Sequence, residues 1–411
     1  MRRKCTDSLI QWKKNPHRHP LLLQGLRQTG KTWLALDFAE KNYKNTLYLN
    51  LETDKPVADY LSVPRPPQDA LLFLETYAGK PLKPSVSLLI LDNIQCVPKL
   101  STLLAALSLD YPQYHIIAIH RGLASPELYS KNDFHIISLY PLDFEEFLWA
   151  NAEYALSREI RRHFSTLTPL GKELHQKALS QFYLYLVTGG MPLSVLEYRR
   201  EKKLLMVPDI QQKLLELILG DISSQAPTGM TRHCQNAWLS IPAQLEKSSR
   251  KFQYSLITKG ATAKTYEKPL NWLLRSGYAL ACRQTSLHLY PTDCGLCARV
   301  LGVPSYQLLT GSDTPAARAC TETFLAQHFT RNGYTLSYWS SGNQAEVPFL
   351  LEKEGRHIAV DYRLTPHQKN RNLTRFRAEM NIDTEMYLLS VEDFREKENY
   401  HIVPVYAGFC V

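Results

Sequence analysis

Short apolar runs alternate with longer segments of helical periodicity over the first 150 residues. Continuous apolar runs are typical of parallel strands buried on both faces, and the segments between them are typical of helices that cover the sheet. We therefore expect a three-layer α/β domain over residues 1–150. Its expected strands are 21–23, 46–51, 87–92, 115–119 and 134–139, with a short helix at 69–76.

The pattern changes after this domain. Residues 143–222 are helical in pattern, with a break at Thr188-Gly189-Gly190-Met191-Pro192, and we interpret 151–225 as a helical lid. Residues 226–303 have the layout of a winged helix, in which helices precede a small hairpin and the third helix enters a DNA groove. The expected elements there are two short helices separated by 238–242, a helix at 263–275 that Pro269 should kink or shorten, and β runs at 278–282 and 287–290.

Residues 304–411 predict a second, smaller α/β unit. A helical segment comes first, and alternating β-rich segments follow it. The expected elements are a helix at 316–329 and strands at 335–339, 347–351, 357–362 and 386–390.

A complete phosphate-binding loop follows the first expected strand, in Gly25-Leu26-Arg27-Gln28-Thr29-Gly30-Lys31-Thr32. Its glycines let backbone N–H groups turn inward around an anion, Lys31 adds a positive charge for the β and γ phosphates, and Thr32 offers a hydroxyl to Mg²⁺. Asp92 ends the strand 87–92, where a carboxylate can orient the water ligands of Mg²⁺. The sequence thus predicts binding of ATP and Mg²⁺ by Gly25, Arg27, Gln28, Thr29, Gly30, Lys31, Thr32 and Asp92.

Two residues near this loop bear on hydrolysis. ATPases of this class usually place a glutamate after the strand-ending acid to polarise the attacking water, and this chain has Asn93 there. An amide cannot accept a proton at neutral pH, so general-base assistance of roughly a hundredfold should be missing. Arg121 follows the strand 115–119 and has two interpretations: a charge-stabilising contact to the phosphates, or a solvated loop arginine.

Composition and charge add a candidate partner. The chain has 411 residues, 44% of them hydrophobic, which is ordinary for a soluble globular protein, and no run approaches the roughly 18 apolar residues of a membrane span. The basic amino terminus lacks an apolar signal core, so we expect a cytoplasmic protein. The eight cysteines suit reduced thiols, and we interpret Cys294 and Cys297 as small packed residues rather than metal ligands.

The net charge of +9 is concentrated between Ala226 and Val300, where ten basic residues face three acidic ones. This basic surplus falls on a segment whose elements follow the order expected for a winged helix, and the combination favours double-stranded DNA as a partner. A basic face can also be only a solvated face. Lys264, Thr265 and Lys268 would face the groove. The other candidate DNA contacts are Lys247, Arg250 and Lys251.

Several motifs together resemble the bacterial and archaeal AAA-type ATPases that carry a C-terminal domain of unknown function. They are the phosphate-binding loop 23–32, Asn50-Leu51-Glu52, Leu91-Asp92-Asn93-Ile94-Gln95, the segment 140–148, Gly189-Gly190-Met191-Pro192 and 240–245. The resemblance implies a P-loop ATPase domain over 1–150, a helical lid over 151–225, a winged helix over 226–303, and a nuclease-like domain over 304–411 with a restriction-endonuclease-like fold.

The chain departs from the family at the nuclease-like site. Relatives resemble a PD-(D/E)xK site, and the aligned residues here are Glu322, then Glu346 to Phe349, then Asp361-Tyr362-Arg363. Pro348 cannot ligate a metal, and Arg363 cannot replace lysine as a tunable acid or base. Glu322, Glu346 and Asp361 remain as a degenerate site, so we expect the domain to be inactive.

The sequence therefore predicts an ATP-binding AAA-type protein with slow or absent hydrolysis, in which nucleotide state is coupled to a basic winged helix that binds DNA. Two alternatives stay open: a DNA- or partner-binding scaffold with a vestigial nucleotide site, and an active nuclease driven by ATP. The sequence does not fix the oligomeric state, and an oligomer is compatible with it.

Overall fold

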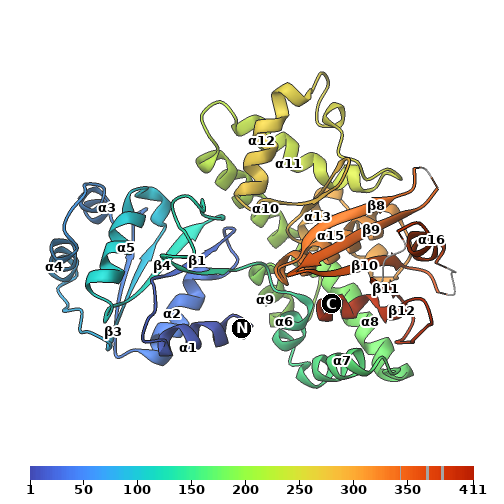
Figure 1. Ribbon diagram of the computed structural model, residues 1–411, viewed down its shortest axis with the longest axis horizontal. Helices are drawn as coiled ribbons and strands as arrows, with labels where there is room; N and C mark the ends of the chain where they lie inside the picture. The colour runs from blue at the N-terminus through green and yellow to red at the C-terminus, as the bar shows by residue number, and fades with distance from the viewer. Residues whose placement is uncertain (343, 367–369, 381–383) are drawn as a thin grey trace. The chain divides into compact units, whose positions relative to one another are not determined.

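The computed structural model describes residues 1–342, 344–366, 370–380 and 384–411 (Figure 1). The chain divides into two compact units. The N-terminal unit contains residues 2–140 and 275–277, and the C-terminal unit contains Met1, 141–274 and 278–411. Among the described residues, no helix is both long enough and apolar enough to cross a bilayer.

The N-terminal unit is built on a parallel sheet with the strand order β2-β3-β4-β1-β5. All five expected strands are confirmed within a few residues. β3 is buried at every position, as the continuous apolar run predicted. The strands are β1 (Leu21–Gly25), β2 (Asn45–Asn50), β3 (Ser87–Asp92), β4 (His115–Arg121) and β5 (His135–Ser138).

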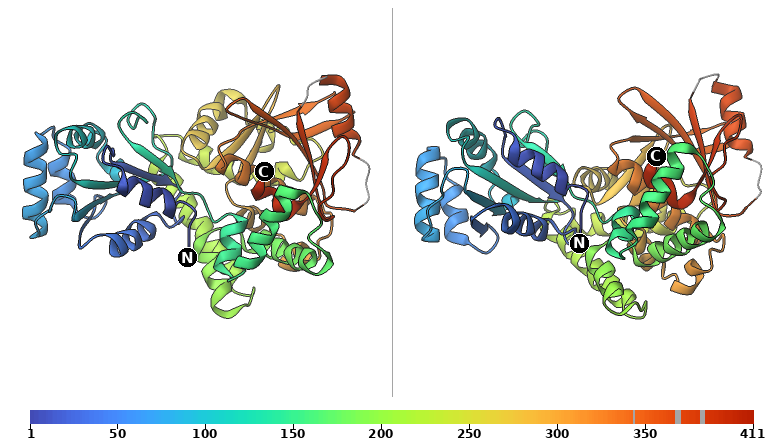
Figure 2. Two further views of the ribbon diagram at one scale, coloured as in Figure 1. Left: turned by 60° about the horizontal axis from the view of Figure 1, so that its bottom comes forward. Right: turned by 90° about the horizontal axis from the view of Figure 1, so that it is seen from below.

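Helices cover both faces of this sheet, because alternate strand residues point to opposite sides. Leu21 and Leu23 pack in one apolar cluster with residues of α1 and α2, while Leu22 packs in the other with residues of α3, α4 and α5. Figures 1 and 2 show the strands between the two groups of helices. The three-layer α/β prediction is confirmed. The helices are α1 (Thr6–Lys14), α2 (Lys31–Asn42), α3 (Lys55–Leu61), α4 (Pro67–Ala78), η1 (Ile94–Cys96) and α5 (Leu100–Asp110).

The C-terminal unit begins with a long helical stretch. The predicted separation of two short helices at 238–242 is wrong, since α11 runs through Pro242. Each internal proline removes one N–H donor, and the buried residues around Pro242 and Pro269 hold both helices continuous. The helices are α6 (Phe144–Ala150), α7 (Tyr154–Thr166), α8 (Lys172–Thr188), α9 (Pro192–Glu201), α10 (Val207–Gln225), α11 (Thr231–Leu245), η2 (Tyr254–Leu256) and α12 (Ala263–Arg275), whose last residue falls in the N-terminal unit.

A two-stranded antiparallel hairpin follows α12, formed by β6 (Ala279–Arg283) and β7 (Leu287–Pro291). The expected order of helices and hairpin is therefore present, and the assignment of a winged helix stays a prediction. Two short helices come next, α13 (Cys294–Leu301) and α14 (Ser305–Leu309).

The chain ends in a five-stranded mixed sheet with the order β12-β11-β10-β9-β8. β8, β9 and β10 are antiparallel neighbours, whereas β10, β11 and β12 are parallel. The expected helix and four strands are confirmed, and the pattern did not predict α16 or β12. The elements are α15 (Pro315–Arg331), β8 (Thr335–Ser340), β9 (Glu346–Lys353), β10 (Arg356–Arg363), α16 (Arg371–Met380), β11 (Glu385–Ser390), β12 (His401–Pro404) and η3 (Val405–Cys410).

Candidate nucleotide-binding site

The loop between β1 and α2 folds tightly where β1 ends. Gly25 has φ 143°, and a Cβ atom there would lie 2.2 Å from the carbonyl oxygen of Leu139, so only glycine fits. Gly30 precedes α2 with φ 92°, again in the region that favours glycine. The hydroxyl of Thr29 donates to the carbonyl of Leu26 at 2.9 Å and closes the loop on itself. The loop is thus shaped before any ligand enters.

Lys31 places its ammonium group on the loop. Its Nζ donates to the carbonyl oxygens of Gly25 and Leu26, at 2.7 Å each, and the residue is buried. Lys31 also begins α2, so the positive end of the helix dipole lies at the same place. Side-chain charge and helix terminus together favour an anion here.

Three oxygen-bearing side chains meet near the loop. The hydroxyl of Thr32 donates to Oδ2 of Asp92 at 2.7 Å, and Tyr48 donates to the same oxygen at 3.0 Å. Burial, followed by the charge of Asp92, raises the pKa of Tyr48 above its usual range, so the phenol is a neutral donor. A hydroxyl and a carboxylate side by side are hard oxygen ligands of the kind that Mg²⁺ prefers. The residues present therefore fit a magnesium ion bound with phosphates.

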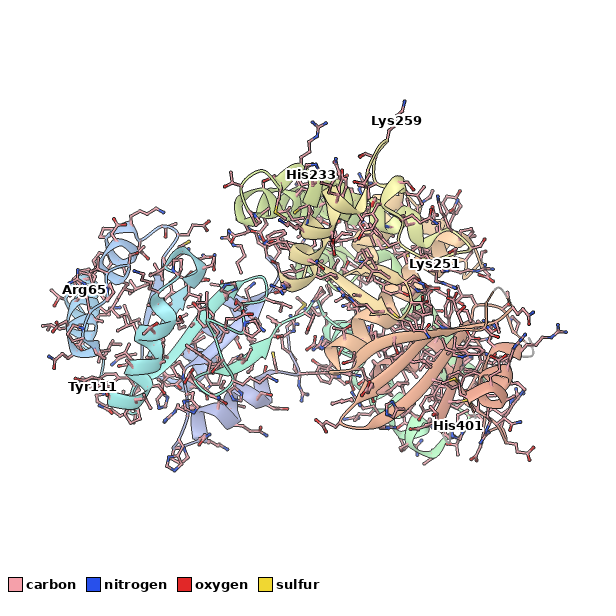
Figure 3. All side chains as sticks on the ribbon, turned by 45° about the horizontal axis from the view of Figure 1, so that its top comes forward. Arg65, Tyr111, His233, Lys251, Lys259 and His401 are labelled. Atoms are coloured by element: carbon pink, nitrogen blue, oxygen red, sulfur yellow. The ribbon has the colours of Figure 1, made fainter. Side chains whose placement is uncertain are left out.

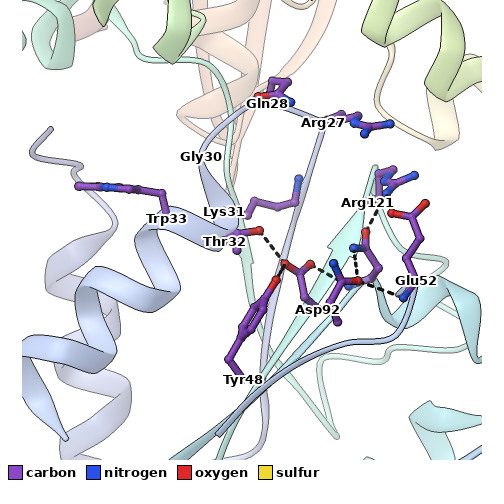
Figure 4. A pocket seen from close by; sticks show the side chains of 12 residues that line it. Arg27, Gln28, Gly30, Lys31, Thr32, Trp33, Tyr48, Glu52, Asp92 and Arg121 are labelled. Carbon is purple, nitrogen blue, oxygen red and sulfur yellow. Dashed lines mark hydrogen bonds and ion pairs between the residues drawn. The ribbon is translucent and has the colours of Figure 1, made fainter. Parts of the chain in front are cut away.

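These groups open onto a cavity of about 400 Å³ (Figure 4). That volume lies in the range of small-molecule sites. Of the predicted ligand-binding residues, all line the cavity except Gly25 and Thr29, which shape the loop instead. The lining residues are Arg27, Gln28, Gly30, Lys31, Thr32, Trp33, Tyr48, Asn50, Glu52, Asp92, Asn93 and Arg121.

Arg121 is the last residue of β4 and is buried, so the interpretation as a solvated loop arginine is wrong. Its Nη2 donates to Oε2 of Glu52 at 2.6 Å and to Oδ1 of Asn93 at 3.0 Å. The hydrogen bond from Arg121 is the main cause that lowers the pKa of Glu52. The sequence reasoning did not assign Glu52 or Tyr48 to the site. Glu52 could have been found, because it follows the end of β2 at the same edge of the sheet as Asp92.

The side chain of Asn93, which lines the cavity, is hydrogen-bonded to three neighbouring side chains. Its Nδ2 donates to Oδ1 of Asn50 at 2.9 Å, and its Oδ1 accepts from Gln95 at 3.2 Å as well as from Arg121. Its backbone has φ 58°, a left-handed conformation that asparagine adopts more readily than glutamate. The amide is thereby fixed in a network of side chains.

Comparison with known families agrees with this geometry. Residues 17–148, which contain all five strands and the cavity, match the family model described as an AAA domain. This part of the chain is therefore similar to AAA-type P-loop domains. The match implies nucleotide binding, typically with magnesium. Residues 179–307 match a model described as a domain of unknown function (DUF8612).

Solved structures show weaker similarity over larger parts of the chain. The Walker-type ATPase PABY2304 of Pyrococcus abyssi has 14% identity and a TM-score of 0.46, covering 73% of this chain and 95% of its own. PCH-2 of C. elegans has 12% identity and a TM-score of 0.29, covering 54% and 68%. Drosophila ORC bound to AT-rich DNA and Cdc6 has 14% identity and a TM-score of 0.24, covering 74% and 90%. No curated protein matches the chain.

The predicted DNA contacts divide into two groups. Lys247, Lys251, Lys264, Thr265 and Lys268 are exposed, and Lys264 and Lys268 lie on the side of α12 opposite its buried residues. Figure 3 shows Lys259, another lysine of this basic segment, projecting from the surface at the top of the view. Arg250 differs from them, because its guanidinium lies between Glu322 and Glu346, and its side chain is 22% exposed. Arg250 is therefore not presented as a groove contact.

The structure brings Glu322, Glu346 and Asp361 into one region. Each of the three carboxylates is paired there with an arginine of the same unit. Arg250 pairs with Oε1 of Glu322 through Nε and with Oε1 of Glu346 through Nη1, the latter at 2.9 Å. Asp361 accepts from Arg363 at 3.0 Å, from Asn370 at 2.8 Å and from Asn372 at 3.0 Å. In the part of the chain that the structure describes, no group of three or more His, Cys, Asp or Glu side chains could hold a metal ion.

The glycine pair of the Gly189-Gly190-Met191-Pro192 motif packs against a buried carboxylate. Asp293 caps α13 by accepting from Leu296 N at 2.9 Å, and it accepts from Gly190 N at 2.7 Å. A Cβ on Gly189 would lie 2.3 Å from Oδ1 of Asp293. Burial raises the pKa of Asp293 to about 6. Cys294 and Cys297 lie buried in the same short helix, and neither forms a disulfide.

Proposed function

We propose that this protein binds ATP with Mg²⁺ in the cavity of the N-terminal unit and uses it as a switch rather than as a fuel. The observation that carries the proposal is the hydrogen-bonded pair of Thr32 and Asp92 beside the loop that bears Lys31. Lys31 would leave its loop carbonyls for the phosphates. Thr32 and Asp92 would hold the magnesium ion, which neutralises charge on the phosphates when bound.

Slow hydrolysis follows from the residues at the place of the general base. Asn93 has no group that accepts a proton at neutral pH, and its amide is already bound to Asn50, Gln95 and Arg121. A water near the phosphates would therefore lose the assistance that a glutamate gives, which is worth at least ~100-fold in rate. ATP would stay bound long enough to define a state of the protein.

The proposed output of this switch is contact with double-stranded DNA. Five predicted contacts, Lys247, Lys251, Lys264, Thr265 and Lys268, are exposed, and exposed lysines suit contacts to phosphates. Arg250 is not part of the proposed surface, because it pairs with two glutamates. The competing proposal is a scaffold with a vestigial nucleotide site, which predicts no shift of the melting temperature on addition of ATP.

Measured ATP turnover tests the proposal. Wild-type protein should turn over far below the ~1 per second that is the low end for ordinary enzymes, and Asn93→Glu should raise the rate at least ~10-fold by supplying a proton acceptor. Asn93→Ala, the matched control, should remain slow. Wild-type turnover at an ordinary rate that survives Asn93→Ala would show that a different residue activates water, and would overturn the switch.

A further inference from the structure

We propose that Glu52 competes with the γ-phosphate of ATP for Arg121, and that this competition sets how strongly the site distinguishes ATP from ADP. The inference rests on the proposed nucleotide binding and assigns a role to a residue that neither the sequence nor the family match identified. It concerns Arg121, which would contact the γ-phosphate, and Glu52, which pairs with Arg121 in the structure.

Strand register places Arg121 beside the phosphate-binding loop. β4 is the neighbour of β1, and Arg121 is the partner of Gly25 across the two strands. Asp92 ends β3 on the other side of β4. Arg121 therefore comes from the strand between the loop and the acid that would hold magnesium. Figure 4 shows Arg121 and Glu52 on the side of Lys31 and Thr32 that faces away from Trp33.

The two members of the ion pair differ in their freedom to move. The side chain of Arg121 is 7% exposed, whereas that of Glu52 is 45% exposed. Glu52 can rotate into water at little cost, because a half-exposed ion pair contributes little. Arg121 is held more firmly, since it is buried and Oδ1 of Asn93 also accepts from its guanidinium. A new anion in the cavity would thus displace the glutamate rather than the arginine.

Guanidinium chemistry makes the exchange favourable for a terminal phosphate. The planar fork of arginine binds a carboxylate or a phosphate oxygen pair in the same way. Lys31, together with Thr32 and Asp92, would direct the β and γ phosphates to this end of the loop. ADP has no γ-phosphate and would leave the pair of Glu52 and Arg121 intact. The lowered pKa of Glu52 keeps it ionised at neutral pH, so that it is a real competitor.

The measurement that isolates this effect is the ratio of the dissociation constants for ADP and ATP. Removing one negative charge from the cavity strengthens binding of both nucleotides, but that general effect largely cancels in the ratio. Glu52→Gln should raise the ratio about fivefold, because it removes the competing carboxylate. The expected size is that of a partly exposed ion pair. Glu40→Gln, which makes the same charge change on the exposed side of α2, should leave the ratio unchanged.

A double-mutant cycle completes the test. Arg121→Gln should lower the ratio of ADP to ATP dissociation constants, and Glu52→Gln should no longer raise it in the Arg121→Gln background. An equal ratio in wild type and Glu52→Gln overturns the competition, as does a rise that persists without Arg121. Lys31→Ala separates this failure from failure of the function itself: if wild type binds ATP and Lys31→Ala does not, nucleotide binding stands whatever the ratios show.

Discussion

The nucleotide cavity and the carboxylate cluster around Arg250 each contain an arginine paired with glutamate, and they differ in what the glutamate faces. In the cavity the glutamate, Glu52, is 45% exposed at its side chain. In the cluster Glu322 is 1% exposed, and Arg250 lies over it. The exposed carboxylate of Glu52 can move away when a ligand binds. The buried carboxylate of Glu322 would be left as an uncompensated charge without Arg250, which would destabilise the fold.

The cavities themselves show the same difference. Around the phosphate-binding loop, Lys31, Thr32 and Asp92 all line the open space. Near Arg250 there is also a cavity, of about 330 Å³, but its lining contains Arg250, Arg318 and Arg363, and Glu322, Glu346 and Asp361 are not among its lining residues. Of the groups that would have to bind a metal, Glu322 and Asp361 are buried beside arginine partners, and Glu346 is 30% exposed but paired with Arg250. Similar residue types thus line the proposed nucleotide site in one region and form an internal ion-pair network in the other.

The largest expected effect is the loss of the buried ion pair. Arg250→Met should lower the free energy of unfolding of the C-terminal unit by about 3 kcal/mol, because it leaves Glu322 charged and without its cation. Urea denaturation followed by tryptophan fluorescence measures the change. A second substitution, Glu322→Gln, should recover part of it. Arg318→Met removes a pair with Asp313 in which the arginine side chain is 52% exposed, and it should cost less than about 1 kcal/mol. Equal losses for the two arginines would contradict the distinction between buried and exposed pairs.

The next effect concerns Asp293, a buried carboxylate that is held by backbone N–H groups instead of an arginine. Its folded pKa of about 6 exceeds the ordinary value of 3.8, so the protonated form is favoured on folding. Its contribution to stability is fully present below pH 3.8 and is lost as pH rises through about 6, a change of up to ~3 kcal/mol.

The pH dependence of unfolding checks this sign. Asp293→Asn should flatten the decline between pH 4 and about 7, whatever its effect on absolute stability, because an amide does not titrate in this range. Glu396→Gln removes an exposed carboxylate of the same unit and should leave the decline in place. A decline of the same size in Asp293→Asn and wild type would show that Asp293 is not its source.

A smaller effect is expected at the magnesium-holding pair. Thr32→Val removes the hydroxyl and should weaken ATP binding in the presence of Mg²⁺ about tenfold, with little change when Mg²⁺ is chelated. Thr32→Ser keeps the hydroxyl and serves as the control. Calorimetric titration with and without chelator measures both. If Thr32→Val weakens binding equally under the two conditions, Thr32 acts on the loop and not on the metal.

The smallest effect is expected on the proposed DNA surface. Lys264→Ala and Lys268→Ala should each weaken binding to a DNA duplex modestly and reduce the slope of log affinity against log salt by about 1. Lys172→Ala changes an exposed lysine on α8, outside the proposed surface, and should leave the slope unchanged. Duplex binding that does not depend on salt would rule out phosphate contacts by these lysines.

Sequence patterns predicted elements well where the information is local. The apolar run 87–92 identified β3, and the alternation of strands and helices gave the three layers of the N-terminal unit. The loop at 25–32 was expected between a strand and a helix and lies between β1 and α2, since the glycines that shape it fall within eight positions; its binding of phosphate stays a prediction. Pro242 misled the prediction because burial around it outweighs the one hydrogen bond that it removes.

Contacts across long sequence separations could not be predicted in this way. Arg250 lies 72 residues from Glu322 and 96 from Glu346, so its charge appeared as part of a basic segment although it is neutralised at a distance. Glu52 and Arg121 are 69 residues apart, and their pairing depends on the order of β2, β3 and β4 in the sheet. Charge counted along the sequence therefore overstates how basic the surface of residues 226–300 is. It also does not reveal that Arg121 is paired with Glu52.

Calorimetric titration of the full chain with ATP and Mg²⁺, beside Lys31→Ala, tests the central claim most directly. The account predicts one site on wild-type protein and a loss of affinity of at least ~100-fold in Lys31→Ala, because the ammonium group makes charge-assisted hydrogen bonds to the phosphates. Absence of binding to wild type, or equal affinity for the two proteins, would contradict it.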